Sequence, residues 1–325
     1  MQKCSKFLHM SQKSSTFAVA KVKKMANTFG DKWSFTSFGE SHGAAIGGVL
    51  DGVPAGLRID FALIRQELAR RAGRGAVGAS ARAKSEPDEV EWLSGVMDGV
   101  TLGTPIAFLI RNKDARPEDY EDLKHTYRVG HADKVYEQKY GIRDWRGGGR
   151  ASARETAARV VAGCIAKQEL AAKDIAIHAE LIQVGAEKKP AKFDETIAAY
   201  QKDGDSIGGI IECRITGLPV GTGEPIFDKL QAHLAYAVMS INACKGFEYG
   251  TGFGGVTEPG SAINGISGGI AGGIADGTEI VFRCVFKPTP STPKAGVKGR
   301  HDACVAVRAV PVVEAMTALA LVQFL

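Results

Sequence analysis

Two histidines among small residues are the first groups in this sequence that could move protons near neutral pH. His42 lies in the string FGESHG at residues 38–43, and His131 lies in RVGHAD at residues 128–133. Imidazole ordinarily changes charge between roughly pH 5 and 8, and small neighbours leave room for a ligand to approach it. These segments therefore predict proton transfer to or from a bound ligand. For His42, a solvent-exposed turn histidine is the alternative.

Arginines gather in a second kind of segment. Residues 65–84 carry a local charge of +5, with Glu67 as their only acid. The planar guanidinium fork suits phosphate and carboxylate oxygens. The small residues around Arg70, Arg71 and Arg74 predict a mobile loop, either one that binds anions or a solvated basic loop.

Glycines lead directly into an alanine-rich helical pattern at residues 146–154, which read RGGGRASAR. Free backbone amides and the positive end of a helix dipole attract anions, and Arg146 and Arg150 stand beside them. The alternatives are an ordinary glycine-rich helix entry and an RNA-binding RGG segment. RGG segments repeat and are disordered, whereas this one is a single copy joined to a helix.

The C-terminal third carries a further possible anion site and a carboxylate. Lys287 stands at the end of an alternating strand pattern, and residues 288–291 (PTPS) place hydroxyl groups after it. Asp302 follows Arg300 and His301, which makes it a plausible proton acceptor in basic company. The many glycines of residues 250–277 predict either close backbone approach to a ligand or tight turns between short strands.

These segments together predict an enzyme acting on a substrate with phosphate and carboxylate groups, with a phosphorylated cofactor as an option. Apolar residues make up 44% of the 325 residues and charged residues 24%, which excludes a disordered chain, a coiled coil and a collagen-like fibre. The net charge is +5, but the first 24 residues hold six lysines and no acid, so the remainder sums to −1. That balance weakens a nucleic-acid-binding interpretation.

The elements that must position these groups are a mixture of helices and strands. No strand is followed by GxGxxG, so a dinucleotide-binding sheet is not supported. No apolar run is long enough for a membrane span. Hydrophobic periodicity and caps predict helices over 61–72 behind Asp60, 152–171 behind a Ser152/Glu155 capping box, 225–241 with Pro225 in first position, and 311–324. Alternation predicts strands at 105–110, 175–184, 207–216 and 279–287.

The basic residues 1–24 are interpreted as a disordered extension, with Met25 as the natural beginning of a domain over 25–325. The cysteines are scattered without metal-like spacing, which predicts reduced packing residues in the cytoplasm. They are Cys4, Cys164, Cys213, Cys244, Cys284 and Cys304.

Eight strings in one order make the sequence similar to a known family. They are FGESHG (38–43), GHAD with EQKYG (130–141), RDWRGGGRASARET (143–156), GDSIGG (204–209), MSINACKGFEYGTGF (239–253), GGIAGGI (268–274), KPTPS (287–291) and GRHDACVAVRAVPVVEAM (299–316). In this set and order they resemble the chorismate synthase family, and the resemblance runs from about Asn27 to the C-terminus.

The resemblance implies one α+β domain, with a helical core between antiparallel sheets, in a cytoplasmic homotetramer. It implies a lyase of the shikimate pathway and aromatic amino-acid biosynthesis that binds neither metal nor nucleic acid. The substrate would be 5-enolpyruvylshikimate 3-phosphate, which loses phosphate in an anti-1,4 elimination to give chorismate. The reaction would require reduced FMN without net redox change. A separate flavin reductase or another source would supply the reduced flavin, and NADP is expected as an associated cofactor.

The resemblance also implies residue roles. His42 would protonate the leaving phosphate, His131 would supply a proton to the reduced flavin, and Asp302 would help to deprotonate the flavin. Substrate contacts would come from Ser41, Arg70, Arg71, Arg74 and Arg128. FMN contacts would come from Arg150, Ala151, Ser152, Asn242, Ala243, Gly272, Lys287, Pro288, Thr289, Pro290, Ser291 and Arg300.

Two departures from the family pattern bear on these expectations. The segments Ser261–Asn264 and Thr292–Val297 are shorter than usual, either through deletion or because disordered residues are omitted from the sequence. RRAGRG at 70–75 replaces the usual RRRPG, which weakens the role of Arg74. A flavoprotein oxidoreductase that consumes NAD(P)H, and an RNA-binding protein that uses the basic tail, are the rival function classes.

Overall fold

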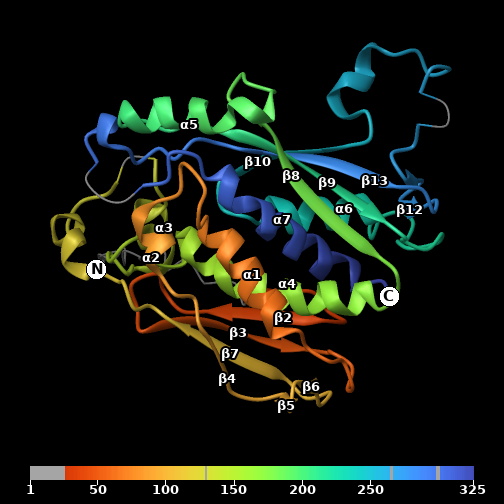
Figure 1. Cartoon of the computed structure of the whole chain (residues 1–325), viewed down its shortest axis with the longest axis horizontal. Coiled ribbons are helices and arrows are strands. Elements are labelled where there is room, and N and C mark those ends of the chain that lie inside the picture. The colour runs from red at the N-terminus through yellow and green to blue at the C-terminus, as the bar shows by residue number, and fades with distance from the viewer. Residues whose placement is uncertain (1–25, 129, 264–265, 298–300) are drawn as a thin grey trace, which may run out of the picture.

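The computed structural model describes residues 26–128, 130–263, 266–297 and 301–325. The predicted extension at 1–24 and the predicted cofactor residue Arg300 therefore lie outside the described residues. Two antiparallel sheets form the outer layers, and long helices fill the space between them (Figure 1). The α+β architecture with a helical core between antiparallel sheets, which the resemblance implied, is confirmed.

The first sheet has five strands in the order β1-β2-β3-β7-β4, and each neighbouring pair is antiparallel. Every second residue of its strand β7 is buried against the helices, namely Ile106, Phe108 and Ile110. This period of two is what a sheet with one face on the core requires. The strands are β1 (Thr28–Phe29), β2 (Ser34–Phe38), β3 (Ala45–Asp51), β4 (Val90–Trp92) and β7 (Ile106–Arg111).

The second sheet has four strands in the order β10-β13-β9-β8, again antiparallel throughout. In β13 the alternation seen in the sequence is confirmed, because Ile280, Phe282, Cys284 and Phe286 are all buried. The strands are β8 (Ala176–Val184), β9 (Gly209–Thr216), β10 (Cys244–Tyr249) and β13 (Ile280–Phe286). Small hairpins pair β5 (Val96–Met97) with β6 (Val100–Thr101), and β11 (Ile270–Ala271) with β12 (Ile274–Ala275).

Four helices make the middle layer, and the backbones of two of them, α4 and α7, are in close contact. A Cβ on Gly163 would lie 2.4 Å from the Cα of Ala315, so a glycine is needed where α4 meets α7. The middle helices are α1 (Phe61–Ala72), α4 (Thr156–Ala171), α6 (Leu230–Met239) and α7 (Ala306–Leu321). Shorter helices α2 (Ala81–Ser85), α3 (Asp133–Tyr140) and α5 (Phe193–Lys202) lie outside this layer (Figure 1).

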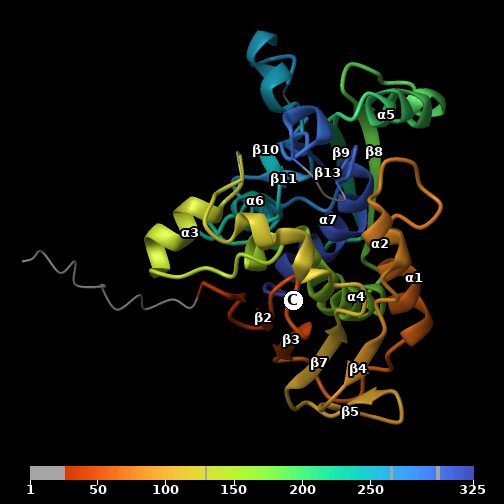
Figure 2. The same cartoon turned by 90° about the vertical axis from the view of Figure 1, so that its left-hand side faces the viewer.

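Short 3₁₀ helices connect these elements. In Figure 2 the segment that carries η5 stands away from the second sheet. The 3₁₀ helices are η1 (Pro117–Leu123), η2 (Gly149–Ala151), η3 (Ala153–Glu155), η4 (Pro190–Lys192), η5 (Gly252–Thr257) and η6 (Pro293–Ala295).

The predicted helix over 61–72 is confirmed residue for residue, and the Asp60 side chain accepts from the amides of Ala62 and Leu63 as an N-cap. The four predicted strands are confirmed to within two residues at each end. Strands β2, β3, β4 and β10 were not predicted.

Three predicted helix starts are wrong. The helix predicted at 152–171 begins at Thr156, because 3₁₀ turns precede it; Ser152 caps η3, while Glu155 pairs with Arg159. The helix predicted at 225–241 spans Leu230–Met239, since Ile226 adopts a left-handed φ of 70° that no α-helix admits. The helix predicted to begin at Pro311 begins at Ala306 and carries that proline inside.

Among the described residues, no helix combines the length and the hydropathy needed to cross a bilayer. The five described cysteines are buried free thiols, and burial raises the pKa of each one above its ordinary value.

Candidate active site

One cavity of about 690 Å³ gathers most of the residues that the sequence singled out. Its wall draws on segments that are far apart along the chain, from Asn27 near β1 to Met316 in α7. The predicted residues on this wall are His42, His131, Asp302, Arg71, Arg128, Arg150, Ala151, Ser152, Asn242, Ala243, Lys287, Pro288, Thr289, Pro290 and Ser291. Their functional roles stay predictions, but the fold brings them to one place.

His42 is seated by a serine and a glycine. The Ser41 hydroxyl lies 3.0 Å from the carbonyl oxygen of Gly147, to which it donates, and 3.0 Å from Nδ1 of His42. Because the hydroxyl proton is given to the carbonyl, the serine oxygen accepts from Nδ1–H of the imidazole. This arrangement leaves Nε2 as the nitrogen that can exchange a proton. Ser41 itself lies buried behind His42 and does not line the cavity.

His131 is oriented by the carboxylate of Asp133. Nδ1 of His131 lies 2.7 Å from Oδ1 of Asp133, and Arg128 donates to both oxygens of that carboxylate at 2.8 and 2.9 Å. Burial works against the charge on Asp133, but hydrogen bonds from Arg128 and His131 outweigh it and hold its pKa well below the usual value. Nη2 of Arg128 also lies 3.0 Å from Nδ1 of His131, but the contact with Asp133 is shorter. Because an ionised carboxylate can only accept, Nδ1 donates to Asp133, and Nε2 is left for proton exchange with a ligand.

Consecutive glycines provide the floor for both imidazoles. Gly147 and Gly148 have φ values of 65° and 89°. A Cβ on Gly147 would lie 2.0 Å from Nδ1 of His42, and one on Gly148 would lie 2.7 Å from Cε1 of His131. Both the left-handed backbone and the space exclude any side chain here. The sequence identified these glycines as an anion site, whereas their position gives them this seating role.

Asp302 is a partly buried carboxylate that contacts an arginine, though the arginine that the structure describes there is Arg308 and not the predicted Arg300. Arg308 Nη1 lies 2.9 and 2.7 Å from its two oxygens, and the amide of Ser80 donates to Oδ1 at 2.7 Å. The sequence named Arg300, which lies outside the described residues. Arg308 comes from the first turn of α7, six residues after Asp302, and was not predicted.

Three arginines form one side of the cavity: Arg71 from α1, Arg154 from η3 and Arg308 from α7. The Arg71 side chain is 2% exposed, which contradicts the predicted solvated basic loop at this position. Burial lowers the pKa of Arg71, the charge of Arg308 lowers it further, and Asp88 only partly opposes them. This wall therefore holds cations close together in a buried setting, as a site for an anionic ligand would.

Aromatic and amide groups complete the wall. Tyr120 in η1 packs edge-on to His42 with ring centroids 4.8 Å apart, and the guanidinium of Arg128 lies 5.9 Å from its ring. Arg150 donates to the carbonyl oxygens of Gly39 and Ser37 at 3.2 Å. Tyr120 carried no motif signal in the sequence.

Besides Ser41, three predicted binding residues are absent from the wall of this cavity. Arg70 points to the opposite side of α1, where it pairs with Glu67 and Glu314. Arg74 donates to the backbone oxygens of Glu86 and Pro87 beside a smaller hollow of about 380 Å³. Gly272 lies in the exposed turn between β11 and β12. The sequence did not show that Arg70 and Arg71 lie in different surroundings, although adjacent residues of a helix project in different directions.

Comparison with known proteins bears directly on this site. The family model described as chorismate synthase matches residues 33–325.

The chain belongs to the chorismate synthase family.

The chorismate synthase of Christiangramia forsetii is 45% identical over 346 residues, which cover 92% of this chain and 97% of that protein. The chorismate synthase of Phocaeicola vulgatus is 43% identical over 357 residues, covering 92% and 98%. A crystal structure of chorismate synthase is similar with a TM-score of 0.73 and 30% identity, covering 91% of this chain and 92% of that one.

The alignment with the C. forsetii protein is longer than the part of this 325-residue chain that it contains. Several dozen aligned positions are therefore filled only in the relative. The predicted shortening at Ser261–Asn264 and Thr292–Val297 stays a prediction of where some of these positions fall.

Chorismate synthases eliminate phosphate from 5-enolpyruvylshikimate 3-phosphate to give chorismate, in the shikimate pathway, and they use reduced FMN. Membership of the family gives this chain that phosphate-eliminating lyase activity and that cofactor. The rival assignments as an NAD(P)H-consuming oxidoreductase or an RNA-binding protein receive no support from the comparisons.

The cavity has features that fit FMN. Oδ1 of Asn242 is buried and has no hydrogen-bond partner among the described residues, although its Nδ2 donates to the carbonyl oxygen of Ala151 at 3.1 Å. An orphaned buried acceptor is costly unless a ligand satisfies it, and the isoalloxazine ring carries N–H groups that can. Lys287 on the same wall offers a cation for the phosphate group. Ala243 has a φ of 67°, a strained value of the kind found at ligand sites.

Proposed function

We propose that the 690 Å³ cavity is the site of phosphate elimination, with His42 and His131 as its proton-transferring groups. The observation that carries the proposal is the pair of imidazoles from distant segments, each packed on one of two consecutive glycines in a cavity with an arginine wall. Proton donors and fixed cations in one buried site are what the departure of a phosphate group requires.

His42 gives a proton to the departing phosphate. Its Nδ1–H is occupied by Ser41, so the transferable proton of the imidazolium is on Nε2. The reaction breaks the C–O bond to phosphate and one ring C–H bond and forms one C=C bond. The donated proton neutralises negative charge on the leaving group as the C–O bond breaks.

His131 and Asp302 manage protons around the cofactor. Asp133 accepts from Nδ1–H of His131, so Nε2 of His131 is the donor toward the cofactor. Asp302 is acceptor-only when ionised and is oriented by Arg308 and the amide of Ser80. It takes the proton that must leave the site when the ring hydrogen has been removed.

The arginine wall and Arg128 hold the anionic substrate. Arg71 and Arg128, predicted as substrate ligands, together with Arg154 and Arg308, provide four guanidinium groups on the cavity surface. Their fixed geometry orients phosphate and carboxylate groups without reorganisation during the reaction. Arg70, Arg74 and Gly272 are left out of this assignment because each lies off the cavity wall.

Reduced FMN, when bound, supplies the transient electron donation that allows a non-acidic C–H bond and an allylic C–O bond to break without net redox change. Asn242, Arg150, Lys287 and the segment 288–291 are the residues that would hold it. Their part is to fix the ring system and phosphate and to exclude water from the reacting atoms.

We further propose a cytoplasmic homotetramer built from one catalytic domain over 25–325, supplied with reduced FMN by a separate flavin reductase or another source, with NADP as the associated nicotinamide cofactor. The buried free thiols support a reducing compartment. Exposed apolar side chains, among them Phe227 at 88% and Phe253 at 80%, support self-association.

An anaerobic assay with photoreduced FMN tests the function. The full chain is mixed with 5-enolpyruvylshikimate 3-phosphate, and phosphate release and chorismate absorbance are followed together. Stoichiometric release of both products without added NAD(P)H is expected. Steady NAD(P)H consumption with substrate, or no phosphate release, would overturn the proposal.

A further inference from the structure

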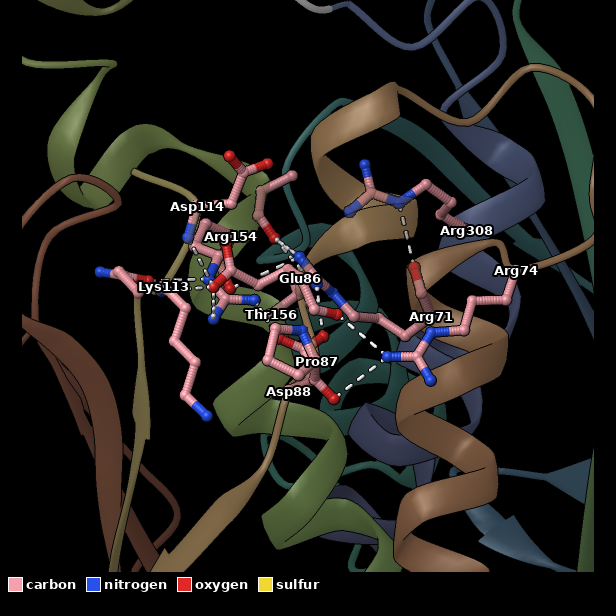
Figure 3. A network of polar contacts seen from close by, with 12 residues as sticks. Arg71, Arg74, Glu86, Pro87, Asp88, Lys113, Asp114, Arg154, Thr156 and Arg308 are labelled. Atoms are coloured by element: carbon pink, nitrogen blue, oxygen red, sulfur yellow. Dashed lines mark hydrogen bonds and ion pairs between the residues drawn. The ribbon is translucent and has the colours of Figure 1, made fainter. Parts of the chain in front are cut away.

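A carboxylate behind the arginine wall contacts two of its three members at once. Asp88 lies just before β4, and its Oδ2 accepts from Nη1 of Arg71 at 3.3 Å. Its Oδ1 makes a very short contact with Nη1 of Arg154 (Figure 3). Asp88 is 3% exposed and does not line the cavity, whereas both arginines do.

The segment that carries Asp88 is fixed on both sides. Arg74 donates to the carbonyl oxygens of Glu86 and Pro87 at 3.0 and 3.1 Å. On the other side, the amide of Lys113 donates to Oε1 of Glu86 at 2.6 Å (Figure 3). These contacts set the position of the carboxylate before any ligand arrives.

Asp88 also adopts a left-handed backbone with a φ of 51°. This conformation is uncommon for residues other than glycine, although Asp and Asn tolerate it best. A bulky or β-branched residue here would be strained, so the backbone itself restricts which side chains can stand behind Arg71 and Arg154.

The hydrogen-bond partners of Arg71 show what the carboxylate of Asp88 adds to the cluster. Arg71 also donates from Nε to the Thr156 hydroxyl at 3.1 Å and from Nη2 to the Ala153 carbonyl at 2.8 Å. Those neutral acceptors orient the group but do not offset its charge. The charges of Arg308 and Arg154 disfavour the charged form of Arg71. Glu86 lies 3.9 Å from Arg154 and Asp302 pairs with Arg308, but Asp88 contacts both Arg71 and Arg154.

We propose that Asp88 is a positioning residue for substrate binding, whose carboxylate holds Arg71 and Arg154 side by side in the geometry that a phosphate or carboxylate group of the substrate needs. The inference rests on the proposed function of the cavity. Asp88 acts through the arginines and touches no substrate, because it lies behind them. Without its charge the guanidinium groups separate, and ground-state binding is lost more than turnover.

Asp88→Asn tests the proposal in the full chain loaded with FMN. Asn keeps the shape and tolerates the left-handed φ but cannot offset two cations. A hydrogen bond to a charged group contributes about 1.5–3 kcal/mol, so KM and the calorimetric Kd for 5-enolpyruvylshikimate 3-phosphate should each rise at least about tenfold. The kcat should change less than about threefold, and FMN fluorescence titration should give an unchanged affinity.

A purely structural role would lower the melting temperature and the active fraction but leave KM unchanged, and that result overturns the proposal. The matched control is Glu91→Gln on β4, which neutralises a carboxylate of an exposed pair with Arg111 and should leave KM unchanged. In the Arg71→Lys background, Asp88→Asn should raise KM by a smaller factor than it does in the wild type, because only its effect through Arg154 remains; full additivity argues against the proposal.

Thr156→Val provides a second route if Asp88→Asn gives no folded protein. The substitution is nearly isosteric and removes the neutral acceptor of Nε of Arg71. A folded Thr156→Val enzyme should show raised KM with little change in kcat, and an unchanged KM counts against arginine positioning. Failure of the wild-type enzyme to release phosphate would refute the proposed function instead, so the two failures are distinguishable.

Discussion

Arg70 and Arg71 are consecutive residues at the end of α1, yet they belong to two buried clusters of opposite character. Arg70 joins Lys167 around the carboxylates of Glu67 and Glu314. Burial lowers the pKa of Arg70, but the hydrogen bond and charge of Glu314 and then Glu67 outweigh it, and the pKa is raised. Arg71 faces other arginines, and its pKa is lowered.

The two clusters differ in whether their cations line the cavity. The Glu314 carboxylate accepts from Arg70, from Lys167 at 2.7 Å and from the amide of Ala179 at 2.9 Å, so its charge is matched within the protein. On the other side, Asp88, Glu86 and Asp302 pair with Arg71, Arg154 and Arg308, but these three arginines line the cavity, which Arg70 and Lys167 do not. We infer that the first cluster ties α1, α4 and α7 together and that the second binds an anion.

His42→Ala and His131→Ala should show the largest effects on the cavity side. Each should lower kcat by about 10²- to 10⁴-fold, the scale of general acid–base catalysis. Stopped-flow measurement of chorismate formation gives the rate, and calorimetry should give a melting temperature near that of the wild type. Full activity in both variants would refute the assigned roles.

Arg71→Leu should weaken substrate binding strongly, because it removes charged hydrogen-bond donors that contribute about 1.5–3 kcal/mol each. An increase of more than about a hundredfold in the Kd for substrate is expected by titration calorimetry. Arg70→Leu is the matched neighbour and should leave Kd unchanged. Equal effects of the two variants on Kd would break the comparison.

Glu314→Gln should destabilise the fold by about 3–5 kcal/mol, the usual cost of breaking a buried charge pair. Urea unfolding followed by circular dichroism measures the free energy, and the KM of the folded enzyme should stay at the wild-type value. If KM rises with no loss of stability, the Arg70 cluster also serves the substrate.

The pH dependence of stability should sharpen the same point. The folded pKa of Glu314 is lowered: burial raises it, but the hydrogen bond from Arg70 and the charge of Lys167 outweigh burial. Its contribution is therefore present above the unfolded pKa of about 4.3 and is lost as pH falls below it. Urea midpoints between roughly pH 5 and 2 should fall less steeply in Glu314→Gln than in the wild type; parallel curves would contradict this.

Arg111→Gln should have the smallest effect. Arg111 and Glu91 are about half exposed, and solvent screens such surface pairs, so they contribute little to stability. Stability and KM should both stay near the wild-type values in the same assays. A change in either larger than that of Glu314→Gln would mean that exposed pairs, and not the buried clusters, dominate.

Local patterns in the sequence were sufficient wherever one short segment carries its own signal. The helix over 61–72 has an N-cap, an apolar stripe and a terminal glycine, and β13 alternates cleanly, so both were predicted. The start of α7 was predicted wrongly because proline is typical of the first position of a helix. In the structure Pro311 lies inside the helix, which begins at Ala306.

The sequence by itself determined the family, the histidines and the carboxylate, since these lie in strings whose types and order are distinctive. It could not tell Arg70 from Arg71, or place Asp88 behind Arg154, because those contacts join residues up to 244 positions apart. Only the packing of α1 against α4 and α7 decides which guanidinium joins the cluster of Glu67 and Glu314 and which lines the cavity. Adjacent side chains on a helix project in different directions, and long-range neighbours set their charge environment.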